Sequence, residues 1–382
     1  MDLRDSPAEA TFRKEVRRWF EANAPRDGER MSFDQQCAWQ RRMAEAGWVG
    51  LAWPAAYGGR GASLIEQAIF NEEITRARAP QPINAIGLNM AGPTIMAIGT
   101  EEQKKRYLRK ILWAEEIWCQ GFSEPGSGSD LGSLRTAARP DGDGFVVNGQ
   151  KVWTSFGPVA DRCSLLARTD PTKGTYGGLT YFLLDMHSPG VDVRPLRQAD
   201  GSAEFSEVFL TDVRIPRADV LGEVDGGWSV AMTTLMHERG TFGFTLVTDA
   251  RMALDELFDL AARTKVDGRR ASDDPVVRQR LGQLHVDVQT MWLNAVRGLS
   301  ATMRTGTPGP EGSLSKLAWG ETMQRIAGLA VEILGVAGLE LDGGTAWPAK
   351  QLRTLAHTIE AGTSEVLRNT VAERVLGLPR SR

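Results

Sequence analysis

The chain has few residues of the kinds that build disulfide frameworks or metal centres. Its 382 residues include three cysteines, Cys37, Cys119 and Cys163, which lie far apart and fit neither pattern. Of the four histidines, no two stand four positions apart. We therefore expect neither a disulfide-based fold nor a structural metal.

Long apolar runs and blocks of like charge are also missing. No segment approaches the roughly 18 consecutive apolar residues of a membrane span, and the N-terminus, MDLRD, has no apolar signal region. Lysine and arginine are scattered along a chain of net charge -3, which argues against nucleic acid as a partner. These absences predict a soluble, cytoplasmic protein without a membrane span, whose ligand is a small molecule.

Chain length and hydrophobic periodicity predict three domains of the α+β class. A single hydrophobic core rarely serves 382 residues. Residues 1–118 and 226–382 show helical periodicity, and the second of these regions has the length of a four-helix bundle. Residues 119–225 contain short runs rich in Val, Phe, Leu and Thr between turn residues, which predicts an antiparallel β domain. Within it, Asn148-Gly149 predicts a hairpin turn.

Two segments of the expected β domain carry the most chemical information. Residues 122–130 read FSEPGSGSD, and their glycines, proline and serines predict a sharply turning backbone with close-set N–H and hydroxyl donors. Residues 151–155 read KVWTS, which places the aromatic face of Trp153 beside two hydroxyls. Alone, the first segment is more often a surface turn, and the tryptophan is more often part of a core. Together they predict a cradle for a flat, hydrogen-bonding cofactor.

The two segments together resemble the flavin-binding signature of the acyl-CoA dehydrogenase family. The family sequence is Ser/Thr-Glu-Pro-Gly-x-Gly-Ser-Asp, followed later by Trp-x-Ser/Thr, and the helix, sheet, helix order also matches over essentially the whole chain. The resemblance implies an FAD-dependent oxidoreductase of lipid and fatty acid metabolism that converts an acyl-CoA to the trans-2-enoyl-CoA. It further implies an electron-transferring flavoprotein as the acceptor.

The reaction needs a base for the α-proton and a donor that polarises the thioester carbonyl. In most relatives the base is a glutamate just before Gly-Thr near the C-terminus, but here that position is Ala361. Glu360 lies one residue earlier, and a shift of one position turns a side chain by about 100° in a helix. Other relatives carry the base on the first helix after the β domain, where the apolar spacing of Trp228 and Leu235 continues to Glu238. We therefore expect Glu238 to be the base, with Glu360 as the alternative.

The surroundings of Glu238 and the thioester site follow from the same resemblance. Burial would raise the pKa of Glu238 and make it a better base, whereas Arg239 would lower it, and a solvated helix face remains an alternative for both residues. The thioester oxygen would be held by the backbone N–H of Ala361, which an alanine still supplies. The resemblance also places the substrate near Ser129, Arg239 and Gly362.

The resemblance assigns flavin contacts to residues from several segments. These are Phe122, Ser123, Ser129, Trp153, Ser155, Arg263, Gly335, Thr363 and Ser364. Trp153 would stack near the isoalloxazine ring, and Ser155 would bond its N5 side. Thr363 and Ser364 open a helix whose first amides favour negative charge, although simple capping explains them equally well.

The segments that reach a neighbouring subunit's flavin in relatives depart from the family pattern here. Arg-x-x-Phe-Gly corresponds to RTKVDG at residues 263–268, and Gln-x-x-Gly-Gly to EILGV at residues 332–336. We expect a homotetramer or homodimer, while a heteromer in which only some interfaces hold FAD stays open. The competing hypotheses are an acyl-CoA oxidase or flavin monooxygenase on the same fold, or a non-catalytic subunit of a heteromeric acyl-CoA dehydrogenase.

Overall fold

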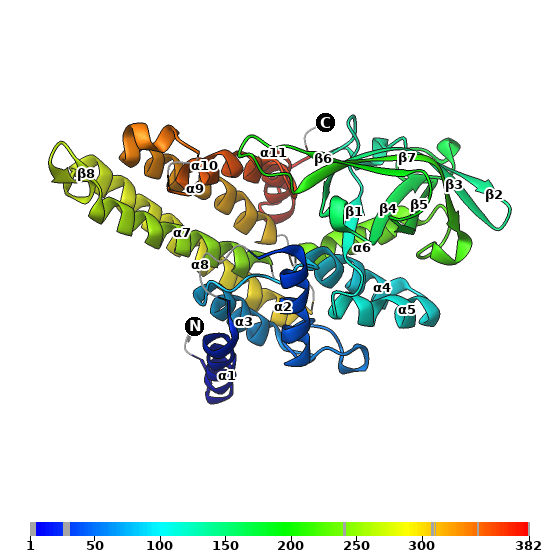
Figure 1. Ribbon diagram of the computed structural model, residues 1–382, viewed down its shortest axis with the longest axis horizontal. Helices are drawn as coiled ribbons and strands as arrows, with labels where there is room; N and C mark the ends of the chain where they lie inside the picture. The colour runs from blue at the N-terminus through cyan, green and yellow to red at the C-terminus, as the bar shows by residue number, and fades with distance from the viewer. Residues whose placement is uncertain are drawn as a thin grey trace.

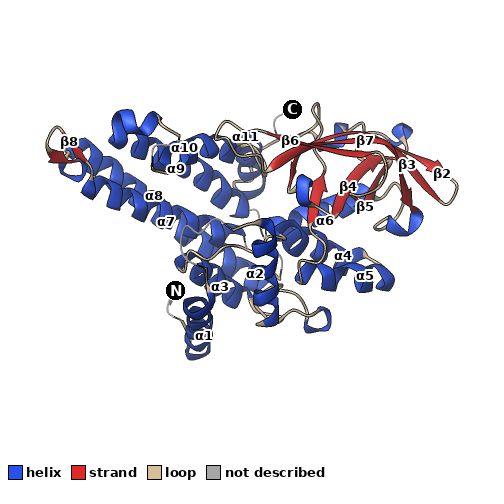
Figure 2. Cartoon of the chain, viewed as in Figure 1, coloured by secondary structure: helices blue, strands red, loops and turns tan. Residues whose placement is uncertain are grey.

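The computed structural model shows two helical regions that pack against each other, with the seven-stranded sheet that lies between them in the sequence at one end of the molecule (Figures 1 and 2). The described residues are 5–25, 31–239, 242–306, 309, 311–341 and 344–380, without the side chains of 237–239, 242 and 311. The expected α+β class and the helix, sheet, helix order are confirmed. The strands of this sheet gather at one end of the molecule, the longest helices extend away from them, and a short two-stranded hairpin lies at the opposite end (Figure 2).

The N-terminal helices begin where the sequence provides caps. Ser6, Ser32, Ser63 and Thr100 each form a capping box with a Glu or Gln three residues later. A shared core includes the stacked rings of Trp48 and Phe70. The helices are α1 (Pro7–Asn23), α2 (Phe33–Glu45), α3 (Leu64–Arg76), α4 (Gly92–Ile98) and α5 (Glu101–Leu112).

The middle region forms one sheet in the order β1-β4-β2-β3-β7-β6, with β5 also paired to β4. Its strands are β1 (Trp118–Gly121), β2 (Ala137–Asp141), β3 (Gly144–Ser155), β4 (Arg162–Arg168), β5 (Leu179–Asp185), β6 (Val191–Leu196) and β7 (Phe205–Pro216). The long strands β3 and β7 pair antiparallel along most of their length. They are the longest strands of the domain that contains both predicted cofactor segments.

The sheet is antiparallel at most of its pairings, as expected, but it also contains two parallel pairs that the sequence did not predict. β1 pairs with β4 in parallel, with Cys119 opposite Cys163. β2 also meets β4 in parallel, at Ala137 and Arg168. Parallel neighbours need a long connection, and the β2–β3 hairpin lies between β1 and β4 in the chain and provides it.

Asn148-Gly149 lies inside β3, so the predicted hairpin turn at these residues is wrong. The register with β7 shifts there, and the Asn148 side chain exchanges two 2.9 Å hydrogen bonds with Asp212, one to its carboxylate and one from its backbone N–H. A Cβ at Gly149 would approach the Thr136 hydroxyl to 2.4 Å. The turn between β2 and β3 is instead made at Gly142, whose φ is +60°. Close packing against the Thr136 segment therefore uses the glycine in a bulge.

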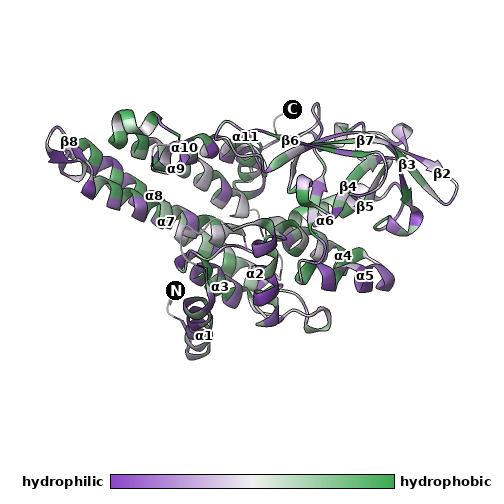
Figure 3. Ribbon diagram, in the orientation of Figure 1, coloured by the Kyte–Doolittle hydropathy of each residue, from purple (hydrophilic) through white to green (hydrophobic). Residues whose placement is uncertain are grey.

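The C-terminal helices pack around a second hydrophobic core. Figure 3 shows hydrophobic and hydrophilic stripes side by side on them, as expected for amphipathic helices. The segment Gly312–Leu339 is long and apolar enough to cross a membrane by composition alone, with a mean hydropathy of 1.3, but here it packs against other helices of this bundle. The elements are α6 (Gly227–Arg239), α7 (Phe242–Arg263), β8 (Lys265–Val266), β9 (Arg269–Arg270), α8 (Pro275–Thr305), α9 (Glu311–Leu334), α10 (Trp347–Thr354) and α11 (Ser364–Thr370).

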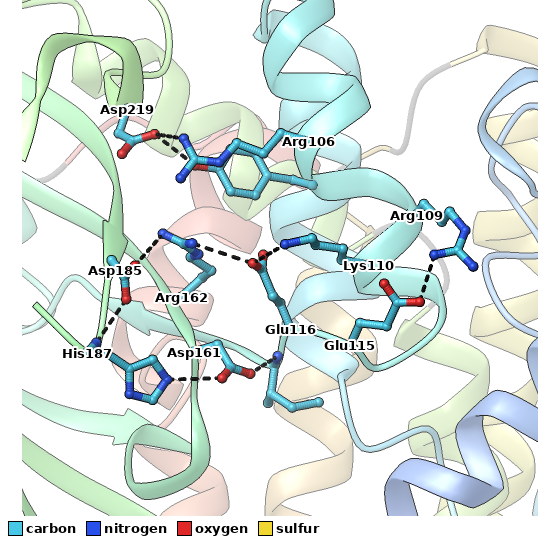
Figure 4. Close-up of polar contacts among 12 residues, drawn as sticks. Arg106, Arg109, Lys110, Glu115, Glu116, Asp161, Arg162, Asp185, His187 and Asp219 are labelled. Atoms are coloured by element: carbon cyan, nitrogen blue, oxygen red, sulfur yellow. Dashed lines mark hydrogen bonds and ion pairs between the residues drawn. The ribbon is translucent and has the colours of Figure 1, made fainter.

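A polar cluster fixes helix α5 against the sheet (Figure 4). The Glu116 carboxylate accepts from Lys110 at 2.7 Å and lies 3.5 Å from Arg162 on β4. Nearby, the Tyr107 hydroxyl donates to Asp219 at 2.8 Å. These contacts hold the N-terminal domain against the β domain in one orientation.

Candidate active site

The structure brings the two predicted cofactor segments into direct contact. Residues 124–127 form a tight turn, in which the Glu124 N–H donates to the Ser127 carbonyl at 2.7 Å and the reverse bond measures 3.0 Å. The Ser127 hydroxyl then donates to the Asp130 carbonyl at 2.8 Å. From β3, the Val152 N–H donates to the Ser123 carbonyl at 3.0 Å. The loop is therefore internally ordered and bonded to the strand.

Trp153 stands outward from β3 because the strand is irregular there. The register with β7 shifts between Lys151 and Thr154, and Trp153 has a φ of +59°. Its indole is 61% exposed and meets Phe205 edge-on at 6.1 Å between ring centroids, while Thr154 is buried. An open aromatic face near a loop of hydroxyl and N–H donors fits a planar, hydrogen-bonding ring such as that of FAD.

The remaining predicted loop residues differ in burial. Phe122 is buried, Ser123 and Ser155 are partly exposed, and Ser129 is exposed. Ser155 pairs with Phe205 at the end of β3. Ser129 therefore has its side chain free to meet a ligand, whereas Phe122 acts through packing.

A line of contacts leads from the loop to helix α6. The Phe122 ring packs edge-on against Tyr181 of β5 at 5.8 Å. The Tyr181 hydroxyl lies 3.3 Å from the hydroxyl of Thr234 on α6, which lies 3.0 Å from that of Thr94 on α4. The N-terminal, β and C-terminal domains thus meet at Thr234.

Glu238 follows Thr234 by four residues on α6. The buried positions of this helix include Gly227, Ala231 and Thr234, and their helical spacing continues to position 238. Trp228 is partly buried against the core, as the apolar stripe predicted. The side chains of Glu238 and Arg239 themselves lie outside the described residues.

Lys316 organises the turn that contains Ala361. Its buried ammonium donates to the His357 carbonyl at 2.7 Å and to the Gly362 carbonyl at 2.8 Å. Between these two points, Ala361 has a φ of +50°, and Gly362 follows with +98°. A left-handed alanine costs roughly 1 kcal/mol, so the surrounding contacts must hold this turn in place.

The predicted contacts at the start of α11 are also located. Thr363 caps the helix and accepts from the Val366 N–H at 3.2 Å. Ser364 is buried. Capping is therefore the role that the structure gives to Thr363.

Glu360 is engaged by a neighbouring cation. Both of its carboxylate oxygens accept from Arg353, at 3.2 and 2.9 Å, and Arg353 also reaches Glu204 of the β domain at 3.2 Å. A bidentate guanidinium pair stabilises the ionised carboxylate and fixes its direction. This arrangement suits a link between domains better than a proton acceptor.

Arg263 and Gly335 lie far from the cofactor segments of the same chain. Arg263 ends α7 beside the β8–β9 hairpin, at the end of the molecule remote from the sheet (Figure 1). Gly335 follows the end of α9. The carboxylate that replaces the family's amide, Glu332, is paired with Arg280 at 2.9 Å, and this guanidinium holds the pKa of Glu332 below its usual range. Its charge is thus compensated locally.

The sequence interpretation missed Lys316, Arg353 and the Tyr181–Thr234 contact. Lys316 left one usable signal, because a lysine between apolar residues at Leu314 and Leu317 of helix α9 is a candidate for burial with polar partners. The Arg353–Glu204 and Tyr181–Thr234 contacts left no local signal, since each joins different domains.

His357 predicts an acid-dependent loss of stability. It is 8% exposed and stacks on Trp319 with ring centroids 4.0 Å apart. Burial, aided by the cations Arg353 and Lys316, lowers the pKa of His357 from 6.5 to about 3. In the unfolded chain His357 binds a proton below about pH 6.5, whereas in the folded chain it does so only near pH 3. The free energy of unfolding therefore decreases as the pH falls through this window.

We expect this histidine to lower the free energy of unfolding by about 2 kcal/mol between pH 7.5 and about pH 5. Urea denaturation at several pH values would measure it, with His357→Gln as the comparison because glutamine does not titrate. Equal pH slopes for the two proteins would contradict the prediction.

Comparison with known proteins covers all three domains. The family models for the N-terminal, middle and C-terminal domains of acyl-CoA dehydrogenase match residues 6–115, 119–213 and 225–376. The chain is 40% identical to acyl-CoA dehydrogenase IpdE1 of Mycolicibacterium smegmatis over 394 residues, or 97% of each chain.

Solved structures give the same result. The fold is similar to the Tcur3481-Tcur3483 steroid ACAD, with a TM-score of 0.87, 31% identity and full coverage of both chains. It is also similar to the ChsE4-ChsE5 complex of Mycobacterium tuberculosis, with a TM-score of 0.86, 31% identity and full coverage. From the matched domains, the fold and the cofactor cradle together, the chain belongs to the acyl-CoA dehydrogenase family and is an FAD-dependent oxidoreductase.

Proposed function

We propose that the enzyme removes hydrogen from the α and β carbons of a CoA thioester whose acyl group is bulky and steroid-derived, forming the trans-2-enoyl-CoA. The contacts of Tyr181 with Phe122 and Thr234 are the main support for the proposal, because they connect helix α6 to the cofactor loop. Thr234 lies one helical turn before Glu238 on α6. The steroid acyl class is supported by the full-length similarity to a structure described as a steroid ACAD.

The residues divide the chemistry between two sides of the acyl chain. FAD, held by the loop 122–130 and Trp153, would supply the acceptor for the β-hydrogen, which leaves as hydride. Glu238 takes the α-proton on a carboxylate oxygen, and the electron pair of that C–H bond forms the new double bond. The Ala361 N–H donates to the thioester oxygen, where negative charge develops as the proton leaves. The electrons pass afterwards to an electron-transferring flavoprotein.

The turn at Ala361 is built for a fixed backbone donor. Ala361 is exposed, and Lys316 holds the carbonyls on both sides of it, at His357 and Gly362. A donor that is already oriented stabilises developing charge without reorganising during the reaction. Alanine in place of the family's glutamate at position 361 therefore leaves in place the backbone N–H that polarises the thioester carbonyl.

We also propose that the working enzyme contains two different subunits. Where the family has a cross-subunit phenylalanine, residues 263–268 of this chain contain no aromatic side chain, and Glu332 places a carboxylate where relatives have an amide. The two similar structures named above are described by pairs of proteins. A companion chain with the usual cross-subunit residues would complete the FAD site of this one.

An acyl-CoA panel with a dye acceptor tests the proposed reaction. The chain is assayed alone and after purification by an affinity tag from its source organism, so that a companion stays bound. We expect FAD and turnover to be retained in the tagged complex, with the highest kcat/KM on ring-bearing acyl-CoA esters. Turnover only on short straight chains would refute the substrate class, and rapid reoxidation in air would favour an oxidase.

A further inference from the structure

A buried ion pair joins the loop 122–130 to strand β3. The Lys151 ammonium lies 2.8 Å from the Glu124 carboxylate and also donates to the Phe122 carbonyl at 3.0 Å. The same carboxylate accepts from the N–H groups of Arg135 and Thr136, at 2.7 and 2.8 Å. The Glu124 carboxylate therefore has three hydrogen-bond partners, all close to the predicted cofactor contacts.

We propose that the Glu124–Lys151 pair is the positioning device of the FAD site, holding the donors of the loop at a fixed distance from the indole of Trp153. The inference rests on the assignment of FAD to this loop and strand. Neither residue is proposed to touch the reacting atoms.

Both side chains are nearly inaccessible, with 1% exposure for Lys151 and 8% for Glu124. Burial lowers the pKa of Lys151, and Glu124 opposes that shift. Burial alone would raise the pKa of Glu124, but Lys151 and the backbone donors outweigh it and hold that pKa below its usual range. Each charge is thus tolerated only in the presence of the other, which makes the pair sensitive to loss of either member.

The pair acts on the two features that the cofactor site needs. Glu124 begins the turn 124–127, so fixing its carboxylate fixes the start of the loop that leads to Ser129. Lys151 lies immediately before the bulge that turns Trp153 outward. The Val152–Ser123 hydrogen bond adds a second link between the same segments. If the loop is already ordered before FAD binds, binding does not have to include the entropy cost of ordering it. Affinity for FAD should therefore depend on the Glu124–Lys151 pair.

The test compares Glu124→Gln, Lys151→Met and the double variant in the enzyme as purified with its companion. FAD affinity is measured by equilibrium dialysis with visible absorbance, and loop order by hydrogen exchange of the amides of Thr136 and Val152 in the FAD-free protein. We expect each single variant to bind FAD at least tenfold more weakly and to exchange these amides at least tenfold faster. The double variant should recover part of both losses, because it leaves no unpaired buried charge.

Glu116→Gln is the matched control. Glu116 and Arg162 are similarly buried, at 11% and 10% exposure, but they join the segment after α5 to β4, away from the loop 122–130 (Figure 4). This variant should lower thermal stability while leaving FAD affinity and both amides unchanged.

The inference would be overturned, while the proposed function stands, if the single variants matched the wild type within twofold in FAD affinity and amide exchange. The same holds if they changed no more than Glu116→Gln does. A wild-type complex that takes up no FAD would refute the proposed function itself and the inference with it.

Discussion

Replacing Glu238 with glutamine is expected to lower kcat by about 10³-fold or more while FAD stays bound. Glutamine has nearly the same shape as glutamate but cannot accept the α-proton, so binding survives and proton removal does not. The position is the next one in the buried spacing of α6, after Thr234. Steady-state turnover with a dye acceptor gives the rate, and visible absorbance gives the FAD content.

Glu360→Gln is the control for this prediction. Glu360 precedes the family's usual base position, but both of its oxygens are held by Arg353. We expect its loss to change kcat by less than about tenfold, through the turn rather than through the chemistry. If Glu360→Gln abolished turnover and Glu238→Gln did not, the assignment of the base would have to be exchanged. Normal turnover in both variants would indicate a non-catalytic subunit.

Lys316→Met is expected to lower the free energy of unfolding by about 3 kcal/mol. We expect the same substitution to reduce kcat/KM. Methionine fills the space of the lysine stem but donates nothing, so the carbonyls of His357 and Gly362 lose a charged donor inside the protein. The left-handed conformation of Ala361 then loses its support. Chemical denaturation and steady-state kinetics measure the two effects.

Lys350→Met serves as the comparison for Lys316. Lys350 forms an ion pair with Glu256, but its side chain is 41% exposed, so its removal should change stability by less than about 1 kcal/mol. Similar losses for the two variants would show that Lys316 contributes no more than a surface cation. A stable Lys316→Met protein with normal kcat/KM would remove the turn from the proposed mechanism.

Local sequence predicted the features that depend on a few neighbouring residues. The capping boxes at Ser6 and Thr100 mark helix starts because the bonds involved span only three residues. The loop 122–130 and Trp153 were identified because turn residues and aromatic residues keep their character in any fold. Asn148-Gly149 shows the limit of this reasoning, since the pair that favours a hairpin turn in isolation became a bulge against Thr136.

The sequence by itself determined the family, the cofactor and the fact that alanine, at position 361, replaces the usual catalytic glutamate. These follow from residue identity and order. Only the tertiary structure decided the partners of each site residue. Glu124 meets Lys151 across 27 positions, and Lys316 meets Gly362 across 46. Contacts at such separations depend on how strands and helices pack, and no short stretch of sequence encodes that packing. The cofactor loop was therefore recognisable from its residues, while the contacts that hold it in place became visible only in the fold.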